Sequence, residues 1–480
     1  MNSIWNKNIQ LFEKRFSSLC SLIKKDVDYF SSRAGKPEEK SLYPFWTLSE
    51  ARTGSITAEE NGLKLHSAYN PQKESEGIVS RQKEKLDSAE AVVFMGFALG
   101  YTPLECAARY PDKQIIIIEP DVTHFLAALL FIDFSALFAC QKLILALSCP
   151  PDQVIALLNQ NSIEKTVLIS VQAHESHAKK YFTTLKELID RNRAKEQINQ
   201  ATLRKFEKLW RTNCRKNAHY LNELEGVNTL KDKFSGIPFL LLGAGPSLEE
   251  ILPMLKDLKE RTKIICVDTA LKACLRHNVE PDFIILTDPQ YWAYRHIAGL
   301  SSPSSTLITE IAAYPAVFRF NCRKIYLCDS QVPMANEYGS VPKGNLGAGG
   351  SVASAALNFC IFCGAKEIYT SGLDLAFPAK QTHIKGSTFE ENVHRTSLKN
   401  STAETKSLPL LFNGNAVQAE DYNGNPVLTD KKMKMFAWWF ESRLAELPEI
   451  KAFTLSPKGL KIPGITPCPM EKILNLPKLC

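Results

Sequence analysis

The fold is decided by one stretch, residues 239–251, which reads FLLLGAGPSLEEI. Its apolar run predicts a strand that is buried on both faces, as in a parallel sheet covered by helices. The glycine-rich turn and the two glutamates that follow predict a helix beginning directly after that strand. Together they indicate a doubly wound α/β domain, a fold that binds its ligands beyond the carboxyl ends of the strands.

Apolar runs of the same kind recur on both sides of this stretch. Downstream they are KIICV, DFIIL, STLIT, KIYLC and KEIYT, each followed by a predicted helix or loop. Upstream, AVVFM and QIIII predict a strand, helix and strand unit, which LILAL and TVLISV extend. We therefore predict an α/β chain with two Rossmann-like doubly wound domains, at residues 86–180 and 235–430.

The other segments are assigned from their composition. Residues 1–85 are polar and mixed, with a helical lead and a strand pair, and are predicted to be a small amino-terminal accessory segment. Residues 181–234 are charged and helical in period, so we predict a helical connector between the two domains. Residues 431–480 contain an amphipathic helix, KKMKMFAWWFESRLAEL, and a closing segment.

The composition excludes several classes of protein. With 480 residues, 45% of them hydrophobic, and a net charge of only +7, the chain is globular, too long for one core, and unsuited to a nucleic-acid partner. The longest apolar stretch, residues 125–140, is too short for membrane insertion, and the amino terminus lacks an apolar signal segment, so we expect a cytoplasmic protein. Cys360 and Cys363 lie in an apolar run typical of a buried helix face.

The turn after residues 239–242 supplies the first candidate binding residues. Glycines let the backbone approach a ligand, and the N–H groups that open a helix attract phosphate. The residues are Gly243, Ala244, Gly245, Pro246 and Ser247. Ser247 can cap the helix, bind a phosphate, or do both. The turn is neither a Walker loop nor the GxGxxG fingerprint, and a plain strand-to-helix turn is the alternative.

Polar residues also follow three later strands. Because the carboxyl ends of parallel strands meet at one edge of the sheet, we expect these residues to lie where such sheets bind substrates, and ribose hydroxyls or a base edge are natural partners for the carboxylates. They are Asp268, Thr287, Asp288, Ser371, Gly372 and Asp374. A helix cap at Asp268 and an Asp-Pro turn at Asp288 are the alternatives.

A second glycine-rich turn, residues 347–351, precedes the apolar helix VASAALNFCIFC. Gly349 and Gly350 precede Ser351, a predicted helix cap, so this turn is another candidate anion cradle. Two such turns in one domain suit the two parts of a sugar nucleotide, its phosphate and its pentose.

Transfer of a sugar to a hydroxyl needs a base for the acceptor proton, and histidine has a suitable pKa. Our candidate for the catalytic base is His383, with His394 as the alternative. A metal-dependent transferase would place a DxD pair at a strand end, whereas the DxD of this chain, at residues 26–28, lies in the predicted lead helix. We therefore expect no metal site and no cofactor.

The motifs GAGPSLEE, CVDTALKACLRHNVEPDFIILTDPQ and GAGGSVASAALNFCIFCGAKEIYTSGLDLAFPAKQTH resemble the motility accessory factor family of flagellin glycosyltransferases over residues 239–465. The central blocks are also similar, in order and spacing, to bacterial sialyltransferases and to 6-hydroxymethylpterin diphosphokinase-like proteins. The resemblance implies a sialyltransferase-like second domain. Two segments, residues 377–383 and 456–459, depart from the family pattern.

The resemblance also implies an activity. It predicts a metal-independent, inverting enzyme that moves a nonulosonic sugar from a CMP-sugar donor to Ser/Thr hydroxyls of flagellin. The residues that it places at the donor phosphate and ribose are Gly243, Gly245, Pro246 and Ser247, and those that it places around the nucleotide and sugar pocket are Asp268, Asp288, Gly350, Ser351, Gly372 and Asp374. One alternative is a diphosphokinase that uses ATP and Mg²⁺, with the carboxylates Asp268, Asp288 and Asp374 as ligands of the ion. Another is a non-catalytic nucleotide-binding motility factor. A methyltransferase-like site at Gly96, Gly100 and Glu119 is disfavoured, because bulky residues fill that glycine turn.

Overall fold

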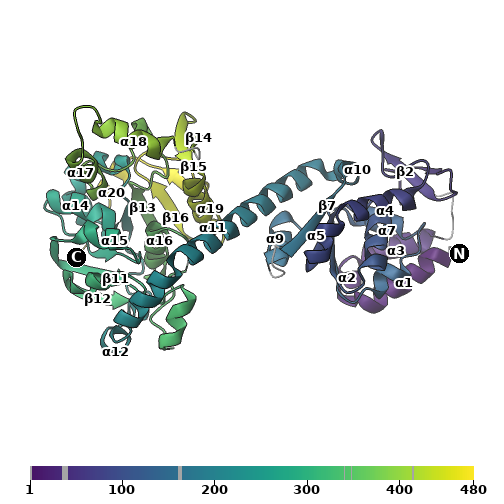
Figure 1. The fold of residues 1–480 in the computed structure, drawn as a ribbon, viewed down its shortest axis with the longest axis horizontal. Helices are drawn as coiled ribbons and strands as arrows, with labels where there is room; N and C mark the ends of the chain where they lie inside the picture. Colours follow the sequence, from purple (N-terminus) through teal and green to yellow (C-terminus); the bar gives the residue numbers. More distant parts are fainter. Residues whose placement is uncertain are drawn as a thin grey trace. The chain divides into compact units, whose positions relative to one another are not determined.

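The chain divides into two compact units, residues 1–197 and 198–480, each containing one parallel sheet (Figure 1). The computed structural model describes residues 3–34, 42–159, 165–339, 341–347, 349–412 and 416–479. Among these residues, no helix has the length and apolar character that crossing a membrane requires. The expected α/β class with parallel sheets is confirmed.

The sheet of the first unit has the strand order β6-β5-β4-β7, with every neighbour parallel. Its strands are β4 Ala91–Met95, β5 Gln114–Glu119, β6 Leu143–Leu147 and β7 Thr166–Ser170. The helices that follow them are α6 Tyr101–Arg109, α7 Val122–Ala128, α8 Ser135–Ala139, α9 Pro151–Asn159 and α10 Gln172–Glu175. Strand, helix and strand units of the expected kind therefore build this sheet.

Both faces of this sheet are buried, which explains why its strands are apolar throughout. Val92 and Phe94 face a core that also contains Trp5 and Phe12 of the amino-terminal segment. The segment of residues 1–85 thus contributes to the core of the first unit. On the opposite face, alternate residues of the same strands pack against residues of α9 and the following long helix.

The amino-terminal segment contains helices and a small antiparallel sheet of order β1-β2-β3. Its elements are α1 Ser3–Arg15, α2 Ser17–Leu22, α3 Lys24–Arg33, β1 Thr47–Glu50, β2 Ile56–Glu60, β3 Leu63–Lys64, α4 Pro71–Arg81 and α5 Lys83–Ser88. The expected helical lead and strand pair are both present.

The expected connector is one helix of 39 residues, α11 Lys179–Asn217. Its first turns bury Phe182, Leu185 and Ile189 in the core of the first unit. Near its end, Cys214 belongs to a core cluster of the second unit. Apolar residues at both ends, and charged residues between them, explain why this helix belongs to both units.

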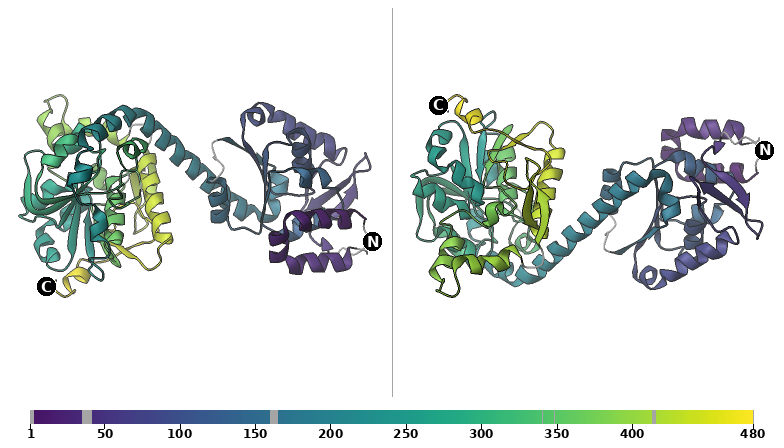
Figure 2. Two further views of the ribbon diagram at one scale, coloured as in Figure 1. Left: turned by 90° about the horizontal axis from the view of Figure 1, so that it is seen from below. Right: turned by 90° about the horizontal axis from the view of Figure 1, so that it is seen from above.

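The sheet of the second unit has eight parallel strands in the order β12-β11-β10-β9-β8-β13-β16-β17. Figure 2 shows this sheet with helices around it. The strands are β8 Phe239–Leu242, β9 Lys263–Val267, β10 Phe283–Ile285, β11 Ser301–Thr309, β12 Asn321–Leu327, β13 Glu367–Ser371, β16 Lys451–Thr454 and β17 Ile465–Pro467. Residues 431–480 therefore complete this sheet, since β16 pairs with β13.

The connections place helices on both faces. Strands β8 to β12 follow one another across the sheet through α13 Leu255–Lys259, α14 Asp268–Arg276 and α15 Tyr291–Ile297. The chain then returns through α16 Val352–Phe362 to β13, on the other side of β8. Because parallel crossovers are right-handed, this reversal puts α16 on the opposite face from α14. The reversal makes the gap between β8 and β13 the switch point where such sheets bind ligands.

Shorter elements surround this sheet. The helices are α12 Tyr220–Glu223, α17 Thr388–Arg395, α18 Ala403–Leu411, α19 Lys431–Ala445 and α20 Glu471–Leu474. A hairpin, β14 Ala416–Glu420 with β15 Pro426–Asp430, lies before α19. The expected amphipathic helix, α19, covers the core with Phe440 and Leu444.

The switch point is closed by a contact between two glycines. Gly243 N donates to Ser371 O at 2.8 Å, and Gly245 N donates to Gly372 O at 2.8 Å. A Cβ atom on Gly243 would lie 2.3 Å from Gly372 O, and one on Gly372 would lie 2.3 Å from Gly243 O. At each of these two positions, the backbone of the other strand therefore leaves no room for a residue larger than glycine.

We expect Gly243→Ala to lower the free energy of unfolding by about 2–3 kcal/mol, because the carbonyl in its way belongs to backbone that cannot move aside. Urea unfolding of the full chain measures this loss. Exposed Gly236 (φ +79°), which has open space around it, is the control, and Gly236→Ala should cost only about 1 kcal/mol of backbone strain. Equal losses in the two variants would contradict the packing argument.

Candidate functional site

The first glycine turn is built differently from expectation. The segment after Gly245 is a 3₁₀ helix, Pro246–Glu250, in place of an α-helix. A second short 3₁₀ turn, Leu252–Met254, follows it. Pro246 at the first position and Pro253 within the second turn explain this, since proline provides no N–H for a continued helical ladder. The turn therefore lacks the aligned peptide dipoles of a long helix.

Ser247 is fixed from inside the protein. Its backbone N–H donates to Asp374 Oδ2 at 2.9 Å, and its hydroxyl donates to Asp374 Oδ1. The same hydroxyl oxygen accepts from Gly372 N at 3.0 Å. Both side chains are buried, and burial raises the pKa of the Asp374 carboxyl. This pair ties the first glycine turn to the end of β13, a role different from a simple helix cap.

The second glycine turn does begin an α-helix. Ser351 caps α16, since its hydroxyl accepts from Ser354 N at 3.2 Å. Gly350 has φ +76°, and a Cβ there would lie 3.1 Å from the ring of Phe436 on α19. Because α16 runs back across the sheet to β13, its first residues lie at the carboxyl edge, the same edge as Gly243.

Three carboxylates gather where β9, β10 and β11 end. Asp268 is the first residue of α14, Asp288 follows β10, and Glu310 follows β11. Burial, with the negative charge of Asp288 as a second cause, raises the pKa of Asp268 to about 7, and the same two causes raise the pKa of Glu310 to about 7. Asp288 itself accepts from Gln290 N at 2.8 Å, as in an Asp-Pro turn. Sequence reasoning missed Glu310, although it ends the apolar run STLIT.

His383 lies beside a second histidine that sequence reasoning also missed. Its ring stacks on Phe389 at 4.3 Å, and His296 of α15 contacts the same phenyl ring at 4.9 Å. Burial lowers the pKa of His383 to about 4, and burial together with the nearby His383 lowers the pKa of His296 to about 4. Each Nδ1 is buried without a hydrogen-bond partner. Both imidazoles are therefore neutral near pH 7.

The loop that carries His383 is bonded to the first glycine turn. Ile384 N donates to Ala244 O at 2.9 Å, and Lys385 N donates to Glu249 Oε1 at 2.9 Å. These contacts bring the candidate base to the same edge of the sheet as the glycine turns.

The predicted site residues fall into two layers. An outer layer is half-buried or exposed: Ala244, Gly245, Thr287, Asp288, Gly349, Gly350, Ser351 and His383. An inner layer is buried: Gly243, Pro246, Ser247, Asp268, Ser371, Gly372 and Asp374. Only the outer layer offers surface to a ligand, while the inner layer holds that surface in place.

Two other groups from the sequence have structural roles. Cys360 and Cys363 are buried at the end of α16, in agreement with the predicted buried helix face. Glu119 of the first unit is buried and accepts from Phe97 N at 2.9 Å and from Asp121 N at 3.1 Å. These bonds occupy the carboxylate that a methyltransferase-like site would use for a ribose.

The buried Asp268 makes stability depend on pH. Its carboxyl has a pKa near 3.9 when unfolded and about 7 when folded, so the unfolded chain loses that proton first and stability falls as pH rises from about 4 to 7. We expect the free energy of unfolding of Asp268→Asn to exceed that of wild type by on the order of 3 kcal/mol at pH 8. This difference should shrink as the pH falls toward 4. Urea unfolding across this range tests it. Asp257 is exposed, so the control Asp257→Asn should show the same dependence of unfolding free energy on pH as wild type. If Asp268→Asn showed that same dependence, Asp268 would not be its cause.

Removing the ring that shields His383 should restore its basicity. In Phe389→Ala, water reaches both imidazoles, so we expect the pKa of His383 to rise from about 4 by at least one unit toward 6.5. Histidine chemical shifts followed by NMR from pH 3 to 8 measure this. Phe412→Ala, which removes another exposed ring of the second unit, is the control. An unchanged His383 titration in Phe389→Ala would show that Phe389 does not provide the shielding.

Several known proteins are similar to part of this chain in sequence, and one solved structure is similar to its whole length. Residues 212–380 match the family model described as 6-hydroxymethylpterin diphosphokinase MptE-like. An uncharacterized protein of Treponema pallidum is 35% identical over 231 residues, which are 42% of this chain and 59% of that relative, so the match spans under two thirds of it. A second protein of the same organism is 27% identical over 255 residues, 52% of this chain and 87% of that relative.

Two proteins whose names state an activity are also similar. The 6-hydroxymethyl-7,8-dihydropterin pyrophosphokinase of Methanocaldococcus jannaschii is 40% identical over 72 residues, 13% of this chain and 30% of that enzyme. The MAf glycosyltransferase of Magnetospirillum magneticum AMB-1 matches in structure with a TM-score of 0.61 and 16% identity, over 100% of this chain and 76% of that chain. The resemblance drawn from the motifs is confirmed: the chain has the fold of a motility accessory factor (MAf) glycosyltransferase and contains an MptE-like region.

Proposed function

We propose that this chain is an inverting glycosyltransferase that moves a nonulosonic sugar from a CMP-sugar donor to Ser/Thr hydroxyls of flagellin. One observation carries the proposal most: a neutral, shielded histidine is bonded through its loop to a glycine turn at the switch point of the sheet. The likeness in fold to a MAf glycosyltransferase over the whole chain supports the same class of reaction.

The outer layer is our proposed donor site. The N-terminus of α16, capped by Ser351, offers N–H groups and a positive dipole end to the donor phosphate. We assign Ala244 and Gly245 to the same donor site, since the Ser247–Asp374 pair fixes their turn at the same edge of the sheet. Thr287 and Asp288 supply hydroxyl and carboxylate groups for the ribose or the base.

His383 is our proposed base. Its neutral imidazole takes the proton of the acceptor hydroxyl as that oxygen bonds to the anomeric carbon. The bond from the anomeric carbon to the phosphate oxygen breaks on the other face, and CMP leaves with its electrons. A single displacement of this kind inverts the anomeric centre. Phosphate charge near the loop would raise the low pKa of His383 toward the range in which a base is effective.

A diphosphokinase is the second candidate, because three carboxylates cluster beside the switch point within the MptE-like region. Oxygen ligands of this kind suit Mg²⁺, which an ATP-dependent transfer requires. Among the described residues, the oxygens of Asp268, Asp288 and Glu310 do not converge on one ion position, so this candidate requires side-chain movement when Mg²⁺ binds. Asp374, the third carboxylate proposed for this role from the sequence, is engaged with Ser247.

Nucleotide binding separates the two candidates and also tests for a non-catalytic nucleotide-binding protein. We expect CMP at 100 times its Kd to stabilise the folded chain by about 2.7 kcal/mol, seen as a rise in Tm without added metal. Incubation with a CMP-sugar and flagellin should then increase the intact mass of flagellin. His383→Gln should keep CMP binding and lose transfer at least 100-fold, whereas His277→Gln, at the exposed end of α14, should transfer normally.

Each result has a distinct meaning. Stabilisation by ATP with Mg²⁺ but not by CMP would favour the diphosphokinase. CMP binding without any transfer would leave a nucleotide-binding factor. Full transfer by His383→Gln would overturn the base assignment and move it to His394 or to the substrate itself.

A further inference from the structure

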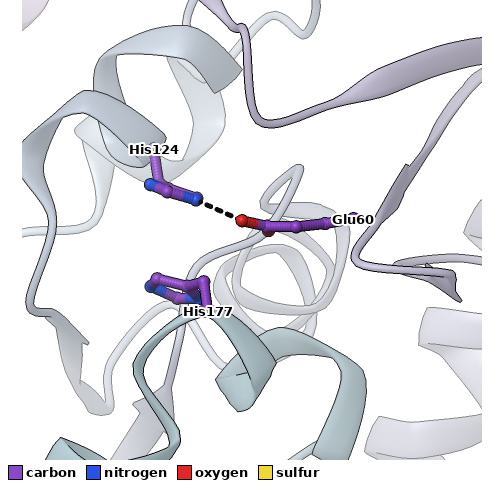
Figure 3. Close-up of side chains that lie close together, drawn as sticks. All are labelled: Glu60, His124 and His177. Carbon is purple, nitrogen blue, oxygen red and sulfur yellow. Dashed lines mark hydrogen bonds and ion pairs between the residues drawn. The ribbon is translucent and has the colours of Figure 1, made fainter.

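A group of metal-ligating side chains lies in the first unit, away from the site described above. Glu60 ends β2 of the antiparallel sheet, His124 lies on α7, and His177 follows β7 in the short 3₁₀ helix Ser176–Ala178. Figure 3 shows the three side chains converging from these separate elements. One potential ligand atom from each lies within 4.8 Å of the other two.

The three side chains are held in place before any ligand arrives. His124 Nε2 lies 2.9 Å from Glu60 Oε1. The His124 ring is stacked between Phe45 at 3.9 Å and His177 at 4.2 Å, measured between ring centroids. Trp46 Nε1 donates to the second oxygen of Glu60 at 3.2 Å. Glu60 and His124 are 5% and 4% exposed, so water competes little for their lone pairs.

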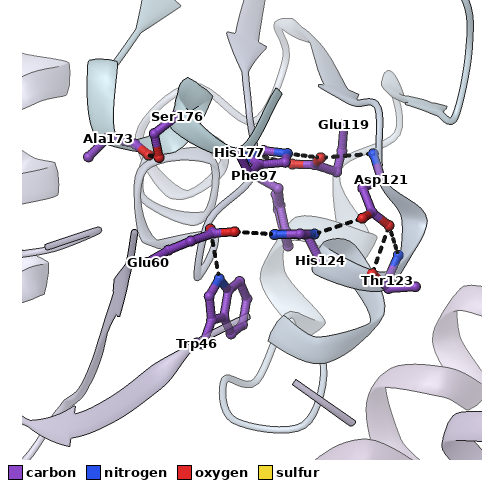
Figure 4. Close-up of polar contacts among 10 residues, drawn as sticks. All are labelled: Trp46, Glu60, Phe97, Glu119, Asp121, Thr123, His124, Ala173, Ser176 and His177. Atoms are coloured by element: carbon purple, nitrogen blue, oxygen red, sulfur yellow. Dashed lines mark hydrogen bonds and ion pairs between the residues drawn. The ribbon is translucent and has the colours of Figure 1, made fainter. Parts of the chain in front are cut away.

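Each histidine also has a carboxylate on a ring nitrogen (Figure 4). Asp121 Oδ2 lies 3.3 Å from His124 Nδ1, and Glu119 Oε1 lies 2.7 Å from His177 Nε2. Carboxylates placed in this way orient metal-binding imidazoles and increase their basicity, and proteins use this pattern around bound metals. Among the residues the structure describes, every ion pair of Glu60, Glu119 and Asp121 is made with one of these histidines.

We propose that Glu60, His124 and His177 bind a divalent transition-metal ion of the zinc class. Two imidazoles and one carboxylate match the ligands zinc takes in three-ligand sites, which leave a further position for water. Calcium and magnesium are disfavoured because they prefer oxygen ligands alone. The ion would place a positive charge beside the buried carboxylates Glu60 and Glu119.

Binding requires a modest rearrangement. Ligand atoms of a tetrahedral zinc ion lie about 3.4 Å apart, given metal–ligand distances near 2.1 Å. The Glu60–His124 pair would therefore open by about half an ångström, and His177 would turn toward the ion. A surface cavity of about 490 Å³ is lined in part by His177 and Tyr181, so His177 borders space that solvent reaches.

Zinc binding to the full chain tests the proposal. After treatment with a chelator, wild type should bind one Zn²⁺ per chain, measured by elemental analysis after dialysis and by a rise in Tm. Glu60→Gln, which keeps the shape of the side chain, and His177→Gln should each weaken binding by at least 10-fold. His277→Gln, an exposed histidine of the second unit, is the matched control and should bind as wild type.

Cysteine ligation needs a separate readout, since the chain has 13 cysteines. Bound Co²⁺ should show the d–d bands of a tetrahedral site without thiolate-to-metal charge transfer. Far-UV circular dichroism tests whether each variant is folded. If His177→Gln does not fold, the result for Glu60→Gln decides the test. A wild type that retains no stoichiometric Zn²⁺, binding unchanged in a folded Glu60→Gln variant, or a Co²⁺ spectrum dominated by thiolate would each overturn the proposal.

Discussion

The contact between the ends of β8 and β13 organises the second unit. These strands meet where the chain reverses direction across the sheet, and their first loop residues continue the backbone ladder through Gly243, Gly245 and Gly372. Side chains on these residues would collide with backbone carbonyls. The Ser247–Asp374 pair then locks the two loops together beneath the surface. Of the outer residues of the candidate site, Gly245 is held by this contact itself, and His383 is held through the bond of its loop to Ala244.

That arrangement explains why one region can resemble two kinds of enzyme. A glycine turn, a capped helix and strand-end carboxylates all face one edge of the sheet, so a phosphate-containing ligand suits it whatever group is transferred. The difference between the candidate reactions lies in the outer residues. A neutral histidine favours transfer to a hydroxyl, while a carboxylate trio favours a metal–nucleotide complex.

The candidate site was predicted unevenly, and the reason is geometric. Strand-end positions such as Asp268 and Asp374 could be placed at one edge because parallel strands share a direction. Neighbouring loops decide whether a side chain at that edge points outward or inward. The burial of Ser247, and the contact of both His383 and His296 with Phe389, therefore could not be predicted from spacing. The cluster of Glu60, His124 and His177 is assembled from residues up to 117 positions apart, too far for any motif to reveal.

Local apolar periodicity was enough to predict the alternation of buried strands and helices, both parallel sheets and a helical segment between the two domains. Tertiary structure decided which residues share a core, and thus placed residues 1–85 within the first unit and residues 431–480 within the second sheet. It also decided which polar groups remain free for a ligand. Some of the predicted binding groups, such as Ser247 and Asp374, form hydrogen bonds with distant segments of the protein instead. No pattern along the chain shows which groups are used in this way.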